Sequence, residues 1–256
     1  MSDGPHRTAA PAPIGVFTAL AWESAAVRAQ LRHAERGGRG VWYARAGHRA
    51  VKVFTCGVGP RRAREVLTQV ATTPFAAIVS AGCAGALVPH LATGQLVLAS
   101  EVSMWSEAGA GQLVRFPADT SLLPQVRLAA ARAAVPVAEG GLFTSDTALC
   151  SPEEKIRRGE ATAAIAVDME SGIYAAFARA RGLPFLALRV ILDPAEMALP
   201  AVTDLLTPEG GVRPWRAAAY VVTHCRHLPV LLSLKRARAV VAQALSRLCA
   251  ALFPVL

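Results

Sequence analysis

The sequence predicts a single-domain α/β protein with a central mixed, twisted sheet flanked by helices. Strand-like apolar runs alternate with helix-like segments, which is the pattern of this fold class. The 256 residues suit one large domain, and 53% of them are hydrophobic, enough for a sizeable core. We expect residues 1–12 to form a flexible tail and residues 13–256 to form the domain, with a basic, amphipathic helical region from about residue 213.

The first half of the chain predicts strands wherever a short apolar run is bounded by turn residues, and helices where apolar residues recur at helical spacing. The expected strands are 14–20, 41–46, 49–56, 76–80 and 95–102, with 41–56 forming a hairpin, and the expected helices are 23–33 and 61 to about 71. We expect the small-residue segment AGCAGA after Ser80 and residues 103–119 to be loops.

The second half predicts a helix at 122–134, a strand that ends at Leu142 and Phe143, and a strongly signalled helix at 151. Ser151 is a good N-cap, because Pro152 follows at the first helical position and Glu154 completes a capping box. Strands are expected at 163–167 and 185–191, and helices at 170–181, 214–227 and 230–252.

The charge of the chain is concentrated near its end. The net charge is +9, and residues 205–256 hold seven Arg or Lys against one acid, Glu209, which is +6 of that total. A basic, apolar region favours an anionic surface, either lipid or nucleic acid, although a solvated helix face explains it equally well. One stripe of the last helix packs against the core or lies on a bilayer: Leu234, Val241, Leu245, Leu248 and Leu252.

Cysteine usage and the absence of apolar targeting segments indicate a cytoplasmic protein, at most peripheral to the inner face of the membrane. The five cysteines are scattered and form no CxxC pair, so neither a disulfide framework nor a zinc site is indicated. The N-terminus has no apolar signal region, and no run is long enough to span a bilayer. His224 and His227, with Cys225 between them, might suggest a metal site. No further ligand of suitable spacing accompanies them, so we expect no metal.

Carboxylates stand at the ends of three expected strands, where ligand sites of open α/β sheets gather. Glu23 follows the first strand, Asp168 and Glu170 follow AAIAV, and Asp193 follows LALRVIL. Burying a charge at a strand exit is costly unless the charge has a partner or a function. The simpler interpretation of each acid alone is a helix N-terminal residue that favours the helix dipole.

The turn GVGPRRA is a candidate phosphate site, because it presents backbone N–H groups at the start of a helix. Gly57, Gly59 and Arg61 are its candidate residues, with Arg62 adding charge. The turn lacks the third glycine of a dinucleotide fingerprint. A tight turn with a solvated Arg pair is the alternative, and we expect no cofactor, with phosphate only as a possible co-substrate.

Six ordered motifs resemble those of the nucleoside phosphorylase and nucleosidase superfamily. They are ALAWESAAV, CGVGPRRA, SAGCAGAL with GQLVLAS, FTSDTALC, VDMES and RVILDPAE. The segment MESGIYAAFARARGLPFLALRVILDPAEMALP and the ending LPVLLSLKRARAVVAQAL are most similar to hopanoid-associated phosphorylases, the branch proposed to remove adenine from adenosylhopane.

The resemblance implies a role for each strand-end acid. Asp193 matches the acid that protonates or hydrogen-bonds purine N7, and its pKa must be raised for that. Glu170 matches the carboxylate that binds the ribose hydroxyls, and Met169 packs against the sugar. Glu23 matches the residue that holds and activates water in hydrolytic members. The transition state is oxocarbenium-like, so the purine must be neutralised as it leaves.

The sequence departs from the family at three positions, all retained as substrate-binding candidates. Asp168 replaces the usual Glu. Leu149 stands where an aromatic ring is common, so the base would rest on backbone groups near Leu149 and Cys150. Cys83, beside Gly82 in the glycine segment, replaces Ser or Thr.

The resemblance implies an enzyme that cleaves the N-glycosidic bond of a 5′-substituted adenosine, most closely adenosylhopane. A methylthioadenosine/S-adenosylhomocysteine nucleosidase is one alternative, and a non-catalytic peripheral membrane or nucleic-acid binding protein is another. Phosphate or water as the nucleophile stays open. We expect a homo-oligomer, because the family pairs its subunits, a nucleoside or nucleolipid substrate, possible contact with an anionic membrane, and no nucleic acid.

Overall fold

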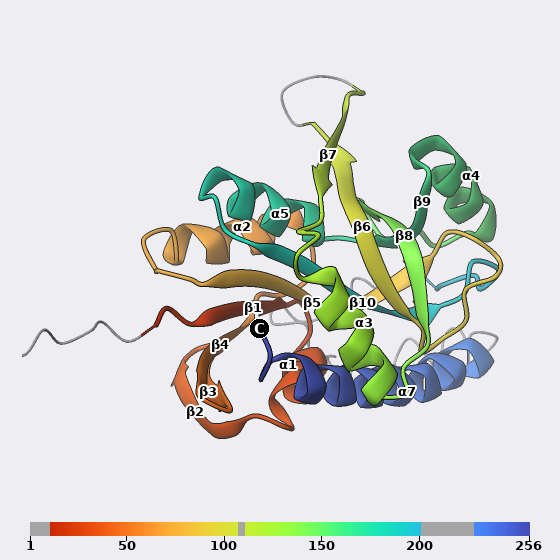
Figure 1. The fold of residues 1–256 in the computed structure, drawn as a ribbon. Helices are drawn as coiled ribbons and strands as arrows, with labels where there is room; N and C mark the ends of the chain where they lie inside the picture. The colour runs from red at the N-terminus through yellow and green to blue at the C-terminus, as the bar shows by residue number, and fades with distance from the viewer. Residues whose placement is uncertain (1–10, 107–110, 201–227) are drawn as a thin grey trace, which may run out of the picture.

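A ten-stranded mixed sheet forms the centre of the protein (Figure 1). The computed structural model describes residues 11–106, 111–200 and 228–256. The strands are β1 Ile14–Thr18, β2 Arg32–Gly38, β3 Val41–Ala46, β4 Arg49–Thr55, β5 Ala77–Ala86, β6 Leu96–Trp105, β7 Leu113–Pro117, β8 Val137–Thr144, β9 Ala164–Asp168 and β10 Phe185–Asp193. The helices are α1 Ala21–Arg28, α2 Pro60–Gln69, α3 Leu123–Arg132, α4 Pro152–Thr162, α5 Ser171–Ala180 and α7 Leu228–Leu252.

The strand order is β10-β6-β8-β9-β5-β1-β4-β3-β2, with β7 beside β6 and an additional pairing of β10 with β5. This last pairing closes β5, β10, β6, β8 and β9 into a ring. Strand β1 runs parallel to β4 and β5, and β5 runs parallel to β10, whereas β5 is antiparallel to β9. The expected mixed α/β sheet is therefore confirmed.

Helices cover both faces of the sheet and bury two apolar clusters (Figure 1). Helices α1, α3 and α7 pack together on one face, while α2 and α5 pack together on the other. The second cluster contains stacked rings, since Phe17 lies 4.8 Å from Phe54 and 4.9 Å from Tyr174 between centroids. The apolar excess of the sequence is accommodated in these two layers.

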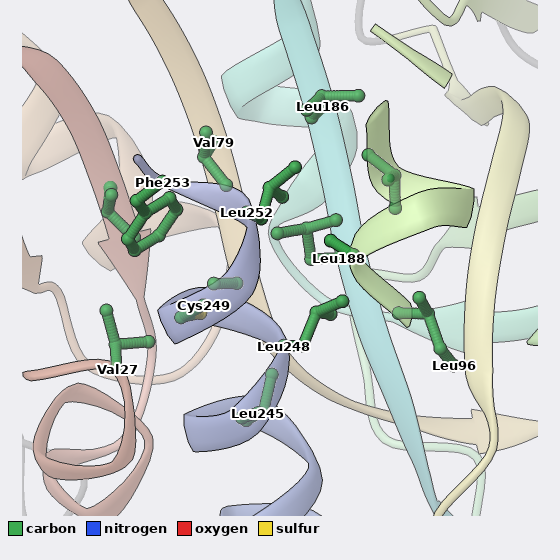
Figure 2. Packing of buried hydrophobic residues seen from close by; sticks show 14 of the residues in the cluster. Val27, Val79, Leu96, Leu186, Leu188, Leu245, Leu248, Cys249, Leu252 and Phe253 are labelled. Carbon is green, nitrogen blue, oxygen red and sulfur yellow. The ribbon is translucent and has the colours of Figure 1, made fainter. Parts of the chain in front are cut away.

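The last helix packs its apolar stripe against the sheet and not against lipid. Val241, Leu245, Leu248 and Leu252 are fully buried. Figure 2 shows Leu245, Leu248 and Leu252 beside side chains of β10 and β6. The bilayer interpretation of this stripe is therefore wrong. Leu234 is only partly buried near the start of the helix.

Three local expectations are also wrong. The first helix ends at Arg28 instead of residue 33, and β2 follows; all seven residues of β2 are exposed, so no apolar alternation marks it. The AGCAGA segment belongs to β5, because pairing with β10 and β9 outweighs the low strand propensity of Gly and Ala. Residues 103–119 are not one loop, since β6 extends to Trp105 and β7 follows.

Several other expectations concern residues outside the described ranges. These are most of the expected tail, the helix at 214–227 and the residues His224, Cys225 and His227. Within the described ranges, no helix combines the length and apolar character needed to cross a bilayer.

Candidate active site

Residues that follow β1 and β9, and the last residue of β10, meet around one cavity of about 230 Å³. Cys83, Ala84 and Gly85, near the carboxyl end of β5, complete its wall. The segments are distant in the sequence, but the sheet brings the carboxyl ends of its strands to one edge. Seven of the candidate residues line this cavity: Glu23, Cys83, Leu149, Asp168, Met169, Glu170 and Asp193.

Glu23 is buried in the first turn of α1, and its carboxylate is held by three backbone N–H groups. Oε2 accepts hydrogen bonds from Ala19 at 3.0 Å and Leu20 at 2.8 Å, which caps the helix. Oε1 accepts a bond of 2.8 Å from Cys83 in β5. Glu23 therefore does act as a helix-capping acid, but it also crosses to β5 and faces the cavity.

Arg189 in β10 is the cation at the centre of the site. It is 1% exposed, and its Nη2 lies 2.7 Å from Oδ2 of Asp168 and 3.7 Å from Oε2 of Glu170. Burial acts to lower the pKa of this guanidinium, but Asp168, Glu170 and Glu23 hold the pKa above its ordinary value. Arg189 also donates to Ser80 Oγ at 2.7 Å.

Asp168 acts mainly as an anchor for its neighbours. Its Oδ1 accepts a hydrogen bond of 2.7 Å from Thr144, and its Oδ2 accepts one of 3.0 Å from the backbone N–H of Ser171 at the start of α5. Together with the contact to Arg189, these bonds engage both oxygens. The short acid at this position therefore fixes Arg189 and the first turn of α5.

Glu170 is buried, and its Oε1 accepts a hydrogen bond of 2.7 Å from the N–H of Gly59. Burial raises the pKa of Glu170 to about 7, although Arg189 acts in the opposite direction. The other oxygen lies beside Arg189. A carboxylate held in this way can accept hydrogen bonds from ligand hydroxyls.

Asp193, the last residue of β10, is 5% exposed, and its Oδ2 lies 2.6 Å from the ammonium of Lys155. Burial raises the pKa of Asp193 to about 6, while Lys155 acts to lower it. Near neutral pH this carboxyl group can therefore carry a proton and donate it, as a general acid must.

Two glycines of β5 leave the space that these carboxylates occupy. A Cβ atom on Gly82 would lie 2.7 Å from both Arg189 Nη1 and Glu23 Oε1, and one on Gly85 would lie 2.9 Å from Asp193 Oδ2. Real Cβ atoms essentially never approach so closely. The glycines are thus required by the packing of the acids against β5, within a strand and not in the expected loop.

The structure places the remaining candidates in different surroundings. Leu149 is buried in the cavity wall, and Cys150 lies next to it, where its carbonyl accepts from Leu199 at 2.8 Å. Gly57 donates its N–H to Ala19 at 3.0 Å. Arg61 is 74% exposed and pairs with Glu65 at 2.7 Å.

Two residues at this site were missed by sequence reasoning, Lys155 and Arg189. Arg189 stands in the RVILD motif four residues before Asp193, inside an apolar strand, and a charge there was itself a signal. Lys155 is one of three lysines among 27 basic residues. It carried no comparable signal, because its helix is mostly polar and its partner lies 38 residues away.

Known proteins similar to this chain include enzymes that are named as nucleosidases. A 5′-methylthioadenosine/S-adenosylhomocysteine nucleosidase of Shewanella frigidimarina is 28% identical over 176 residues, which cover 63% of this chain and 76% of that protein. The nucleosidase of the same name from Neisseria meningitidis, solved with methylthio-immucillin-A, superimposes with a TM-score of 0.73 at 17% identity, over 96% of this chain and 100% of that one.

Futalosine hydrolase of Helicobacter pylori is also similar, with a TM-score of 0.67 and 17% identity over 93% of this chain and 97% of that one. These structural likenesses show the fold. The family model described as "Phosphorylase superfamily" matches residues 13–207, well over half of the chain. This match confirms the superfamily that the sequence motifs predicted. The chain therefore belongs to the phosphorylase superfamily.

Proposed function

We propose that this protein cleaves the N-glycosidic bond of a 5′-substituted adenosine and uses water as the nucleophile. One observation carries the proposal: Glu23, Glu170 and Asp193, from three distant parts of the chain, line one cavity. The named activities of the relatives support it, because the Shewanella protein is a nucleosidase of such substrates.

The three acids supply complementary functions. Asp193 donates a proton to N7 of the departing purine, and Glu170 accepts hydrogen bonds from the ribose hydroxyls. The C1′–N9 bond breaks while the water oxygen bonds to C1′, and a water proton passes to Glu23. Such a division between an acid and a base is what an oxocarbenium-like transition state requires.

The charge of the cavity favours water over phosphate. Among its described lining residues are four carboxylates, Glu23, Asp168, Glu170 and Asp193, and one cation, Arg189. A phosphate dianion would add charge of the same sign as this excess, whereas water adds none.

The candidate phosphate turn already has other partners. Gly59 donates to Glu170, Gly57 donates to Ala19, and Arg61 and Arg62 both pair with Glu65. A bound phosphate would have to replace these contacts.

Incubation with substrate in phosphate-free buffer and in phosphate buffer tests this nucleophile. We expect equal rates of adenine release and a free 5-substituted ribose in both. A ribose 1-phosphate that forms only with phosphate present would show phosphorolysis instead.

We propose an apolar 5′ substituent, with adenosylhopane as the specific substrate. Leu20, Val58, Leu149, Leu192 and Leu199 line the cavity together with Met169. The volume of about 230 Å³ is below the range of roughly 300–1,000 Å³ common for ligand pockets. A triterpenoid would therefore extend out of the cavity mouth.

The discriminating assay compares kcat/KM for adenosylhopane in detergent with that for 5′-methylthioadenosine and S-adenosylhomocysteine. A preference for adenosylhopane supports the proposal. Equal or better cleavage of the two soluble nucleosides favours a methylthioadenosine/S-adenosylhomocysteine nucleosidase. Failure to release adenine from any of them would favour a non-catalytic protein.

Contact with an anionic membrane fits this substrate, and α7 offers a surface for it. Leu232 and Val240 are each 48% exposed, and Lys235 and Arg236 are exposed between them along the helix. Each basic residue near an anionic bilayer contributes about 1 kcal/mol. Sedimentation with vesicles that contain or lack phosphatidylglycerol tests this contact, and the variant Lys235→Glu/Arg236→Glu should stay in the supernatant.

A further inference from the structure

The ammonium group of Lys155 is enclosed in the protein wall behind Asp193. Lys155 is 1% exposed, and its Nζ lies 2.6 Å from Asp193 Oδ2, 2.8 Å from the carbonyl oxygen of Met197 and 3.1 Å from that of Pro194. An ammonium has three N–H donors, and these three acceptors match that number. Such a fully bonded, buried lysine is expensive to desolvate, so its position calls for a function.

Helix α4 is built to bring Lys155 to this place. Ser151 caps the helix by accepting the N–H of Glu154 at 3.1 Å, which fixes where the first turn begins. Gly159 lies four residues after Lys155, on the same face of the helix. A Cβ atom on Gly159 would lie 2.9 Å from the carbonyl oxygen of Leu87. The missing side chain therefore lets α4 approach the sheet closely enough for Lys155 to reach β10.

We propose that Lys155 is a positioning residue that acts through Asp193, holding Oδ2 so that Oδ1 is the oxygen presented to the purine. This inference rests on the proposed role of Asp193 as the acid. It assigns to Lys155 the alignment of that acid, because a carboxyl group tied at one oxygen loses most of its rotational freedom.

Lys155 also fixes the chain that follows Asp193. Its bonds to the carbonyl groups of Pro194 and Met197 hold the turn after β10, and the N–H of Leu199 then donates to Cys150 at 2.8 Å. Leu149 and Leu199 line the cavity on this side. One side chain thus aligns the acid and the adjoining apolar wall.

The charge of Lys155 sets the range of pH in which Asp193 is protonated. The groups that face Asp193 are Lys155 from α4, Cys83 from β5 and Cys150 from the segment before α4; Arg189 on β10 itself and Glu23 lie further along the same cavity. Lys155 acts to lower the pKa of Asp193 against the effect of burial. Removal of this cation should therefore raise that pKa, and adenine release should persist to higher pH.

The test compares Lys155→Met and Lys155→Arg with the wild type and with Lys52→Met, a matched control in β4 whose ammonium lies 5.4 Å from the ring of Tyr43. The measurement is kcat/KM for adenine release against pH, with adenosylhopane or 5′-methylthioadenosine, whichever the wild type cleaves faster. We expect Lys155→Met to lose about 10²-fold at its optimum, because the acid is no longer aligned. The decline of kcat/KM at high pH, the alkaline limb, moves only when the pKa of Asp193 rises above the value of about 7 held by Glu170. An opposite charge at this distance shifts a pKa by about 1–3 units, so we expect the decline in Lys155→Met to move up by about one pH unit.

The other variants follow from the same reasoning. Lys155→Arg keeps the charge, so its limb should stay in place and part of the rate should return, while Lys52→Met should match the wild type. Circular dichroism shows whether Lys155→Met folds. If it does not, Lys155→Gln removes the charge but keeps a hydrogen-bond donor, and the decline of kcat/KM at high pH is measured with that variant. An alkaline limb that does not move in a folded, uncharged variant overturns the inference.

Failure of the inference can be told from failure of the proposed function. If the wild type releases no adenine, or if Asp193→Asn is fully active, the function itself is wrong and the inference falls with it. If Asp193→Asn is inactive but the limb of Lys155→Met is unmoved, only the role of Lys155 is wrong.

Discussion

The backbone N–H of Gly59 donates a hydrogen bond of 2.7 Å to Oε1 of Glu170, a residue 111 positions later in the chain. The turn after β4 thereby fixes the carboxylate that follows β9. The sequence offered this turn as a phosphate site, but in the structure its N–H holds the proposed ribose-binding acid. An anion does occupy the start of α2, as the helix N-terminus favours, and that anion is a side chain of the protein.

Replacement of Glu170 by Gln should lower kcat/KM by about 10² or more. The amide retains an oxygen for Gly59 but no longer offers a charged acceptor to the ribose hydroxyls, and charge-assisted hydrogen bonds are about twice as strong as neutral ones. Steady-state release of adenine measures the loss. A 2′-deoxy substrate is the matched control, because it should lose much less on the same substitution; equal losses for both substrates would argue against ribose binding by Glu170.

The dependence of kcat/KM on pH should be a narrow bell centred at about 6.5, between the two shifted values. Asp193 must be protonated, and its protonated fraction declines as pH rises through its pKa of about 6. Glu170 must be ionised, and its ionised fraction declines as pH falls through its pKa of about 7. Because Asp193, which must be protonated, has the lower pKa, only a minority of the free enzyme carries protonated Asp193 and ionised Glu170 at the same time. A flat profile between pH 5 and 8 would contradict these assignments.

Replacement of Asp168 by Asn should destabilise the fold by about 3–5 kcal/mol, because it removes the charged partner that lies closest to Arg189. The contact of 2.7 Å is buried on both sides, and Asp168 also holds Thr144 and the first turn of α5. Urea unfolding followed by circular dichroism gives the change in free energy. Asp146→Asn is a useful control, since this acid is exposed; comparable destabilisation by both would contradict the anchoring role.

Substitution of Gly85 by Ala should reduce kcat strongly while leaving the protein folded. The new methyl group would stand 2.9 Å from Asp193 Oδ2 and would push the acid away from its place beside Lys155. A displacement of about 1 Å can cost about 10²-fold in rate. Rapid-quench measurement of adenine formation in a single turnover isolates the chemical step, and an unchanged rate there would show that the carboxyl group tolerates the methyl group.

The order of the elements and the acids at their ends could be predicted because they depend on local patterns. Apolar runs that exit into Glu23, Asp168 and Asp193 signal strands whose ends meet at one edge of a sheet. The Ser151 cap was equally local, and the structure shows its hydrogen bond to Glu154. Most of the candidate substrate-binding residues lie in one cavity for the same reason.

What could not be predicted depends on pairing between distant segments. Strand β2 is exposed throughout and exists because β3 lies beside it. The Gly- and Ala-rich end of β5 is a strand because β10 and β9 pair with it. The ion pair between Lys155 and Asp193 joins two elements whose approach is set by the fold as a whole, so no spacing in the sequence marks it.

Helix α7 packs against both elements that carry the two acids at opposite sides of the proposed reaction centre. It contacts both α1, which carries Glu23, and β10, which ends at Asp193, and its side chains lie between them in the core (Figure 2). A shift of this helix would therefore move Glu23 and Asp193 together. If α7 also rests on a bilayer, binding to lipid would change the rate of the proposed reaction through a surface outside the cavity.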